Sequence, residues 1–380
     1  MSAMDEALEV LQSVPLIGEL PSTRLCAEVR LPGWAGWLTL TYIDGHNDWP
    51  HLIRGFYDNK LDGRFGPGND LVGHVDLKRL RRGKSGGAFW SVYVDCPTSD
   101  DYNDDSAHFE ILRDTMQQID LVHRLVHLYK DDMGLVHSAS DIMRLFNEGK
   151  FVSLIGVEGL HQIANSPSVL RLYHRLGVRY VTLAHSKNNL YADSATAAAP
   201  AHEGLSAKGK EMVREMNRIG IAAIVGHPRN VPDSVLEMLR VNQGIIMVSF
   251  IPPLTAVDAA ESNLDRLVDH IIHVGTLIGY DHVGLGSDFD GMFSAVKGID
   301  DVSHYPSLVA KMLERGIGRA DVQKILGLNV IRVLEQVERT SAACYDELPV
   351  MGEEVKQLWN DGFRAAVKQV YPHAEQDLPR

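Results

Sequence analysis

The chain has 380 residues, of which 45% are hydrophobic and 23% are charged. This length can bury one large core, and a barrel-type domain can absorb it without division, so we expect residues 1–380 to form a single domain. Fifty acidic and 37 basic residues give a formal charge of −13, which repels phosphate backbones and anionic membrane surfaces. We therefore expect neither a nucleic acid nor a membrane as a partner.

Helical and strand patterns alternate along the chain. Apolar residues at helical spacing predict helices at Asp105–Lys130, Ser140–Asn147 and Lys208–Arg218. Short apolar runs predict strands that follow or precede these helices, at Trp37–Ile43, Phe151–Gly156, Arg179–Ala184, Ile221–Val225, Gly244–Phe250 and His282–Gly286. Strands separated by helices favour βαβ units and a parallel sheet, which places the chain in the α/β class.

The beginning of the chain lacks a basic segment followed by an apolar stretch, and no apolar run has membrane-spanning length. The three cysteines, Cys26, Cys96 and Cys344, form neither a zinc pattern nor an even disulfide set. We therefore expect a cytoplasmic protein with reduced thiols.

Polar residues stand at the carboxyl ends of several predicted strands. His46 and Asp48 follow the first apolar run, and Glu158, His185 and Asp288 each follow a later one. In a (β/α)8 barrel of the TIM type, the active site is built at that end of the strands, so these side chains should converge there.

The residue types in this set suit a divalent metal ion. Imidazole and carboxylate groups are common zinc ligands, and in an extended His-x-Asp segment the two side chains point to the same side. His46 and Asp48 can therefore hold one ion together. A His-x-Asp pair alone is a frequent coincidence, but its position after a strand, with Glu158 and Asp288 in the same setting, favours a metal site.

Seven segments in one order resemble the membrane (renal) dipeptidase family of zinc metallopeptidases. They are DGHNDWP (Asp44–Pro50), FWSVYVDCP (Phe89–Pro97), GVEGLHQI (Gly156–Ile163), RYVTLAHSKNN (Arg179–Asn189), HPRNVPDSVL (His227–Leu236), GLGSDFDG (Gly284–Gly291) and GLNVIRVLEQVE (Gly327–Glu338). The resemblance implies a TIM-type (β/α)8 barrel that hydrolyses dipeptides by a metal-bound hydroxide between two zinc ions.

The resemblance also implies a role for each site residue. His46, Asp48 and Glu158 match metal ligands, with Glu158 bridging the two zinc ions. His185 matches a catalytic histidine that contacts the substrate, and Arg229 matches the arginine that binds the terminal carboxylate of the substrate. Asp288 matches the acid that shuttles the proton, a role in which a carboxylate beside the metals serves the leaving amine.

Two departures from the family pattern affect these expectations. The first is that residues 18–43 resemble nothing in the family, whereas residues 340–380 are expected simply to extend the domain as C-terminal helix and are not counted as a departure. After Gly220 the family continues through a strand, a helix and a second strand that supply the two histidines of the second zinc, whereas here His227 follows within a few residues. About 30 residues or more, a βαβ-sized piece, are missing. Splicing or a gene-model error would explain both departures.

The missing piece predicts a barrel that is incomplete or distorted near residues 220–228, with one zinc ion or fewer bound well and weakened dipeptidase activity. His227 could substitute as a ligand, but Pro228 directly after it favours a loop histidine. His161 is expected to be a satisfied core or loop histidine. Cys96 matches a cysteine that is disulfide-bonded in secreted relatives, but its partner position is Lys187, so we expect no bridge.

Two other functions stay open at this point. One is a catalytically silent binding or scaffold protein on the same fold, and the other is a different barrel amidohydrolase that acts on ring amides. Arg229 favours dipeptides because a guanidinium group suits a free carboxylate. The oligomeric state is open, with a homodimer as one option.

Overall fold

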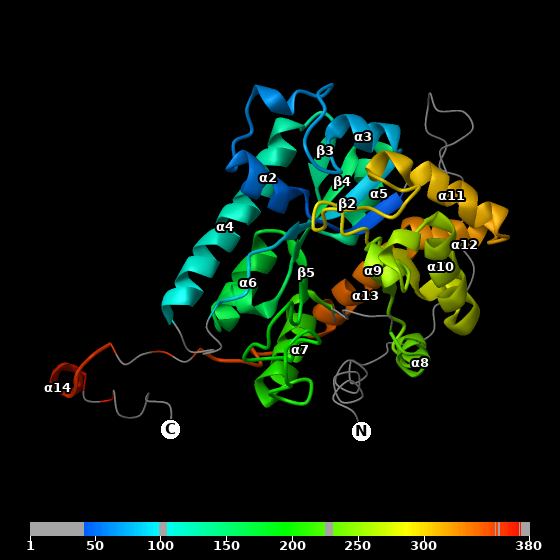
Figure 1. Cartoon of the computed structure of the whole chain (residues 1–380). Coiled ribbons are helices and arrows are strands. Elements are labelled where there is room, and N and C mark those ends of the chain that lie inside the picture. Colours follow the sequence, from blue (N-terminus) through cyan, green and yellow to red (C-terminus); the bar gives the residue numbers. More distant parts are fainter. Residues whose placement is uncertain are drawn as a thin grey trace.

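Parallel strands form the centre of the molecule (Figure 1). The computed structural model describes residues 42–98, 105–224, 231–353, 355, 358–371 and 373. A six-stranded sheet has the order β1-β2-β4-β5-β6, with β3 also paired to β4, and a two-stranded sheet pairs β7 with β8. The strands are β1 (Tyr42–Asn47), β2 (Ser85–Val92), β3 (Met133–Leu135), β4 (Phe151–Val157), β5 (Val178–Thr182), β6 (Ala222–Ile224), β7 (Ile246–Val248) and β8 (Val283–Leu285).

The two sheets meet where β8 and the loop after it run beside β1. The backbone N–H of Asp288 donates to the carbonyl of His46 at 3.0 Å, and the N–H of Asp48 donates to the carbonyl of Phe289 at 2.8 Å. The strands therefore follow one another from β6 through β5, β4, β2 and β1 to β8 and β7, as a curled parallel sheet.

In the part of the chain that the structure describes, the ring of strands does not close between β6 and β7. Among the described residues, β6 pairs only with β5, and β7 pairs only with β8. All residues of β6 and β7 are half-exposed, whereas those of β4, β5 and β8 are buried. An edge strand is exposed to solvent on the side where it has no neighbouring strand, which explains why β6 and β7 are less buried than the inner strands. The predicted incomplete barrel of the TIM type is confirmed for the described residues, with its open side beside β6, which ends at Ile224.

Helices surround the curled sheet. The longer ones are α2 (Trp49–Tyr57), α4 (Asp105–Leu128), α5 (Ala139–Asn147), α6 (Pro167–Arg175), α7 (Ala207–Ile219), α8 (Asp233–Val241), α10 (Leu264–Ile278), α11 (Tyr305–Glu314), α13 (Asn329–Ala343) and α14 (Asp361–Val370). Shorter ones are α3 (Leu77–Arg82), α9 (Pro252–Thr255) and α12 (Arg319–Gln323). Helix α14 lies away from the others, and none of its residues is buried (Figure 1). No helix in the described ranges is both long and apolar enough to cross a membrane.

Local sequence signals explain where several helices begin and end. The side chain of Ser206 accepts a hydrogen bond from the N–H of Gly209 at the start of α7, and Gly220 ends the same helix with a φ of 87°. Ser138 and Asp141 form a capping box before α5. These polar groups satisfy backbone atoms that the first and last helical turns leave unpaired.

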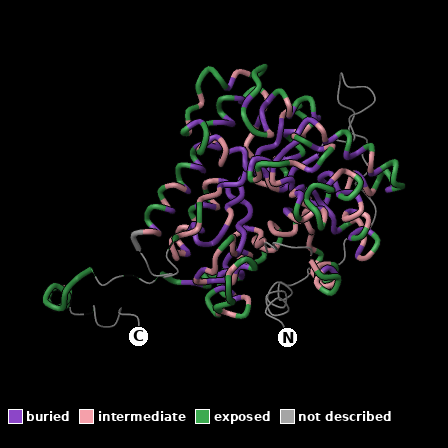
Figure 2. The backbone as a smooth tube through the Cα atoms, viewed as in Figure 1, coloured by how far each residue is buried: buried purple, intermediate pink, exposed green. Residues whose placement is uncertain are grey.

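The buried residues concentrate along the strands and on the helix faces that cover them (Figure 2). Large aromatic side chains fill much of this core: the rings of Tyr42 and Tyr305 stack at 3.5 Å, and those of Trp49 and Trp90 lie 5.5 Å apart. The core brings β1, β2 and β8 together, so their carboxyl ends lie at one edge of the molecule.

The predicted helices and the later predicted strands are present, with ends that differ by at most two residues, whereas β1 runs four residues beyond the predicted end at Ile43. The strand predicted at Phe151–Gly156 is β4, and the helix predicted at Asp105–Lys130 is α4. Strands β2 and β3 were not predicted. The first apolar run is described only from Tyr42 onward, and the unmatched segment 18–43 lies almost entirely outside the described residues.

Candidate functional site

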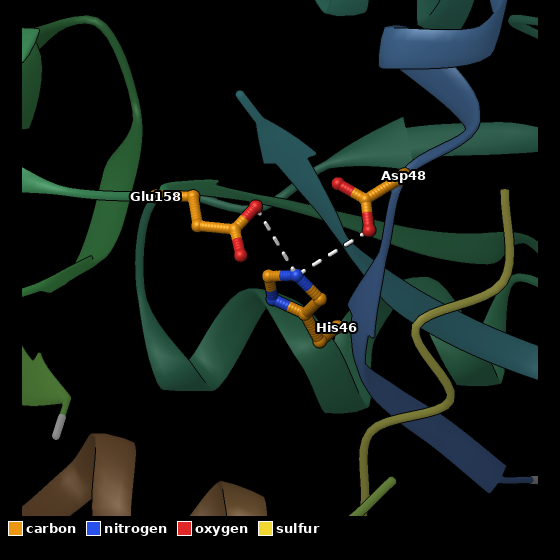
Figure 3. Close-up of side chains that lie close together, drawn as sticks. All are labelled: His46, Asp48 and Glu158. Carbon is orange, nitrogen blue, oxygen red and sulfur yellow. Dashed lines mark ion pairs between the residues drawn. The ribbon is translucent and has the colours of Figure 1, made fainter. Parts of the chain in front are cut away.

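His46 and Asp48 lie at the carboxyl end of β1, and Glu158 follows β4 directly. The Nε2 atom of His46 lies 3.4 Å from Oδ2 of Asp48 and 3.5 Å from Oε2 of Glu158. Both carboxylates point toward the imidazole ring (Figure 3). One ligand atom from each of the three residues lies within 4.8 Å of the others, which is close enough for a single metal ion to be shared by all three.

Asp288 brings a third carboxylate to the same point. Its Oδ1 atom lies 3.5 Å from Nε2 of His46. Asp288 has a φ of 64°, a left-handed conformation that short polar residues tolerate better than most. A side chain on Gly291 would collide with the carboxylates of Asp48 and Asp288, so a glycine keeps this edge of the site open.

Two hydroxyl groups orient the ligand side chains. The Tyr180 hydroxyl lies 2.7 Å from Nδ1 of His46, so the imidazole presents Nε2 to the carboxylates. The hydroxyl of Ser91, on β2, donates to Oε2 of Glu158 at 3.1 Å. Such outer partners fix the rotamer and the tautomer of metal-binding side chains.

Asp48 has two buried carboxylate oxygens without a hydrogen-bond partner among the described residues. An ionised carboxylate that loses its water and gains no donor is costly, and a cation removes most of that cost. The site therefore combines buried acceptors that lack donors with an imidazole nitrogen, a donor set that fits a zinc-like divalent ion.

The pKa shifts of the residues in this cluster also indicate that the site attracts positive charge. Burial alone would lower the pKa of His46, but Tyr180, Glu158 and Asp48 together raise it well above its usual value. Burial would raise the pKa of Asp48, yet the neighbouring His46 lowers it. Burial and the charge of Asp48 raise the pKa of Asp288 well above its usual range.

His185 stands on the far side of Glu158. Its Nε2 atom lies 3.5 Å from Oε1 of Glu158, and its ring packs at 4.6 Å from the ring of Tyr93. His185 is half-exposed, so its ring is accessible from solvent.

Asp44 ties β1 to the loop that carries Asp288. Its Oδ1 atom accepts from the N–H of Ser287 at 2.8 Å, and its Oδ2 atom accepts from the Ser287 hydroxyl at 2.5 Å and from Asn47 at 3.1 Å. Asp44 is 1% exposed, so this connection is buried. It holds the two strands that bring His46 and Asp288 together.

The structure brings together five of the predicted site residues: His46, Asp48, Glu158, His185 and Asp288. Arg229 and the alternative ligand His227 lie outside the described residues.

Sequence reasoning missed Tyr180, Ser91 and the connection made by Asp44. Tyr180 lies within an apolar strand pattern, where a tyrosine is expected in the core, and Ser91 lies in a strand that the pattern did not identify. Neither residue carries a sequence signal that distinguishes this role from ordinary packing within a strand.

The family comparison gives a match over most of the chain. The model of the membrane dipeptidases (peptidase family M19) matches residues 38–223 and, separately, residues 221–346. The first match ends at residue 223 and the second begins at residue 221, so the two matches meet within three residues of Gly220, where the missing piece was predicted.

The curated relatives support the same family assignment. The chain is 52% identical to Dipeptidase tcpJ of Claviceps purpurea over 405 positions, covering 99% of this chain and 94% of the relative. It is 44% identical to Dipeptidase verJ of Clonostachys rogersoniana, covering 86% of this chain and 92% of the relative. The alignment with tcpJ is longer than the 380 residues of the chain, so it contains positions that this chain lacks.

Solved structures show the same fold at low sequence identity. A metallopeptidase from Rhodobacter sphaeroides, bound to a phosphinate mimic of the dipeptide L-Ala-D-Ala, has a TM-score of 0.66 at 21% identity and covers 78% of this chain and 99% of its own. The Pseudomonas aeruginosa protein PvdM has a TM-score of 0.70 at 20% identity, with coverage of 89% and 99%. With the family match over two long segments and a relative at 52% identity, the chain belongs to the membrane dipeptidase family and is a hydrolase of the dipeptidase type.

Proposed function

We propose that this chain hydrolyses dipeptides with a zinc ion held by His46, Asp48 and Glu158. The observation that carries the proposal is the convergence of three carboxylates, including Asp288, on Nε2 of one histidine. Both oxygens of Asp48 are buried, and neither accepts a hydrogen bond from a described residue. Three protein ligands with an open position are the usual composition of a catalytic zinc site.

A divalent ion at this position would lower the pKa of a water molecule and polarise the peptide carbonyl. The chain's own residues do the rest. Tyr180 contacts Nδ1 of His46, so that Nε2 is left to bind a metal ion, and the Ser91 hydroxyl donates to one oxygen of Glu158. These contacts fix the ligands before the substrate arrives, which avoids rearrangement during the reaction.

Asp288 and His185 are proposed to act on the substrate. Asp288 lies 3.5 Å from Nε2 of His46, beside the proposed metal ligands, and would carry a proton to the leaving amine. His185, half-exposed beside Glu158, would donate to the carbonyl oxygen as negative charge develops on it. Arg229 is proposed, from the family resemblance, to bind the terminal carboxylate of the dipeptide.

We also propose that at most one zinc ion binds well and that activity is weakened. In the family, the two histidines of the second zinc come from the piece missing after Gly220. The family match breaks there, and β6 and β7 are left as open edges on that side. A second ion would then have Glu158 as its one proposed ligand. Loss of an interaction worth about 3–4 kcal/mol would slow turnover by about 10²–10³-fold.

The test compares this chain with a version in which the family's strand-helix-strand piece is inserted after Gly220. Both are assayed for hydrolysis of dipeptides with added zinc. We expect slow hydrolysis by this chain and a rise of about 10²–10³-fold in the version with the insert. Equal rates would mean that another ligand, such as His227, completes the site.

The same assay separates the other two functions. A silent binding or scaffold protein would show no turnover in either version, including after zinc addition. An amidohydrolase of another kind would hydrolyse ring amides but leave dipeptides intact.

A further inference from the structure

Cys96 lies beside the proposed active site but is not part of it. It follows β2 in the chain, and its Sγ atom lies 3.8 Å from Nδ1 of His161. The thiol is free and half-buried, and it lines a cavity of about 280 Å³ together with Tyr93 and Asp95. Cys96 therefore borders a space that a small molecule can enter.

The contact made by Nε2 of His161 determines which ring nitrogen carries the hydrogen. Its Nε2 atom lies 2.8 Å from the carbonyl oxygen of Val94. A carbonyl can only accept a hydrogen bond, so Nε2 carries the hydrogen and Nδ1 presents a lone pair to the thiol of Cys96. His161 is 3% exposed, so its ring is held in this orientation. This is the geometry of a base that removes a thiol proton.

Other groups face the thiol from neighbouring segments. His185 and Ser186 approach from the loop after β5, and Tyr93 lies on the same segment as Cys96. Burial alone would raise the pKa of Cys96, but hydrogen bonds to His161 and His185 lower it to about 5. The thiolate form is therefore favoured near neutral pH.

We propose that Cys96 is a nucleophilic thiol that exchanges with small disulfides entering this cavity, with His161 as its base. Nδ1 of His161 takes the thiol proton, and the thiolate attacks one sulfur of the disulfide R–S–S–R. A new bond forms between Cys96 and that sulfur, the original S–S bond breaks, and the leaving thiolate recovers the proton from His161. The product is a mixed disulfide on Cys96 and one free thiol.

The adduct would lie next to a residue of the proposed substrate site. Cys96 contacts His185, and His185 packs against Tyr93 and faces Glu158. A group attached to Cys96 would crowd the open side of His185, and this consequence rests on the proposed function. The exchange itself depends only on Cys96 and His161.

The chain contains its own comparison thiol. Cys344 is also free and half-buried, but burial and Glu347 raise its pKa. We would treat the native full chain with iodoacetamide at pH 6 and follow both peptides by mass spectrometry. We expect Cys96 to react about 10- to 10²-fold faster than Cys344, because the larger thiolate fraction outweighs its lower intrinsic nucleophilicity. Equal rates would overturn the proposal.

A variant and a disulfide probe complete the test. His161→Gln keeps an amide donor for Val94 but has no base, so labelling of Cys96 at pH 6 should slow about 10-fold or more. Glutathione disulfide should add to Cys96 and not to Cys344, and a phosphine reductant should remove the adduct. No adduct on Cys96 would contradict the exchange, whatever the dipeptidase assay shows. If treatment with glutathione disulfide stops dipeptide hydrolysis by the unmodified chain but not by Cys96→Ser, the adduct on Cys96 lies on the side where the substrate binds.

Discussion

The hydroxyl of Tyr180 lies 2.7 Å from Nδ1 of His46, so a residue of β5 holds the imidazole of β1 across the interior of the curled sheet. The ring of Tyr180 packs over Gly156 of β4, where any side chain would collide with it. Three strands therefore cooperate to direct one nitrogen of His46 toward Asp48 and Glu158.

Removing this hydroxyl should weaken metal binding without unfolding the protein. In Tyr180→Phe, His46 loses the partner that fixes its tautomer, and we expect the zinc dissociation constant to rise by about 10-fold or more. Competition with a chelator would measure it. The control is Tyr173→Phe, which removes a buried hydroxyl that donates to the carbonyl of Gln162 at 2.8 Å, away from the site. The same loss of affinity in both variants would argue against the orienting role.

Asp44→Asn should lower both stability and zinc affinity. The asparagine amide would place its N–H₂ group opposite the donors of Ser287 or Asn47, so at least one hydrogen bond would be lost. We expect the unfolding free energy to fall by about 1–3 kcal/mol. The β1 and β8 ends would then separate, moving His46 from Asp288. Thermal unfolding and zinc titration measure the two effects. The exposed Asp58→Asn is the control, and an Asp44→Asn variant equal to it in both assays would refute the connection.

Two glycine substitutions in helices should have opposite signs. Gly55 in α2 has open space where a side chain would stand, so Gly55→Ala should stabilise the protein by about 0.5–1 kcal/mol. In α7, a side chain on Gly209 would collide with the carbonyl of Tyr191, so Gly209→Ala should destabilise it by about 1–3 kcal/mol. Shifts of the unfolding temperature in the same direction would show that α7 packs differently.

Glu215 should make the protein sensitive to acid. Its side chain is fully buried and pairs with Arg171 at 2.9 Å and Arg218 at 2.6 Å. Burial would raise the pKa of Glu215, but these two arginines and the N–H of Val350 lower it below its usual value. A carboxyl whose pKa falls on folding stabilises the fold fully above its unfolded pKa, and this contribution is lost as pH falls through the folded pKa.

The variant Glu215→Gln should therefore be less stable at pH 7, by about 1–3 kcal/mol, because two arginines lose a buried partner. The difference from the unmodified chain should shrink as the pH falls below the usual glutamate range. Thermal unfolding between pH 3 and pH 7, roughly the window in which a carboxyl titrates, measures it. Glu237→Gln, which removes an exposed pair with Arg240, should show little difference at any pH. A difference for Glu215→Gln that stays constant with pH would contradict the assignment.

Part of the site could be predicted from the sequence because strand ends are easy to recognise. Glu158 and Asp288 follow short apolar runs, and parallel strands bring such positions to one edge. The gap in the barrel could also be predicted, because it reflects chain that is absent between Gly220 and His227. The role of Tyr180 could not be predicted. A tyrosine inside an apolar strand gives the same sequence pattern whether its hydroxyl contacts a metal ligand or its side chain only fills the core. Strand β2 was missed because Gly86 and Gly87 weaken its apolar pattern.

The number of zinc ions bound per chain tests the central claim most directly. The purified chain would be titrated with zinc and its bound metal measured after removal of free ion, alongside His46→Ala and His273→Ala. His273 is an exposed histidine paired with Asp233, far in sequence from the site. We predict at most one tightly bound zinc in the unmodified chain and in His273→Ala, and none in His46→Ala. Two tightly bound ions per chain, or one retained in His46→Ala, would contradict the account.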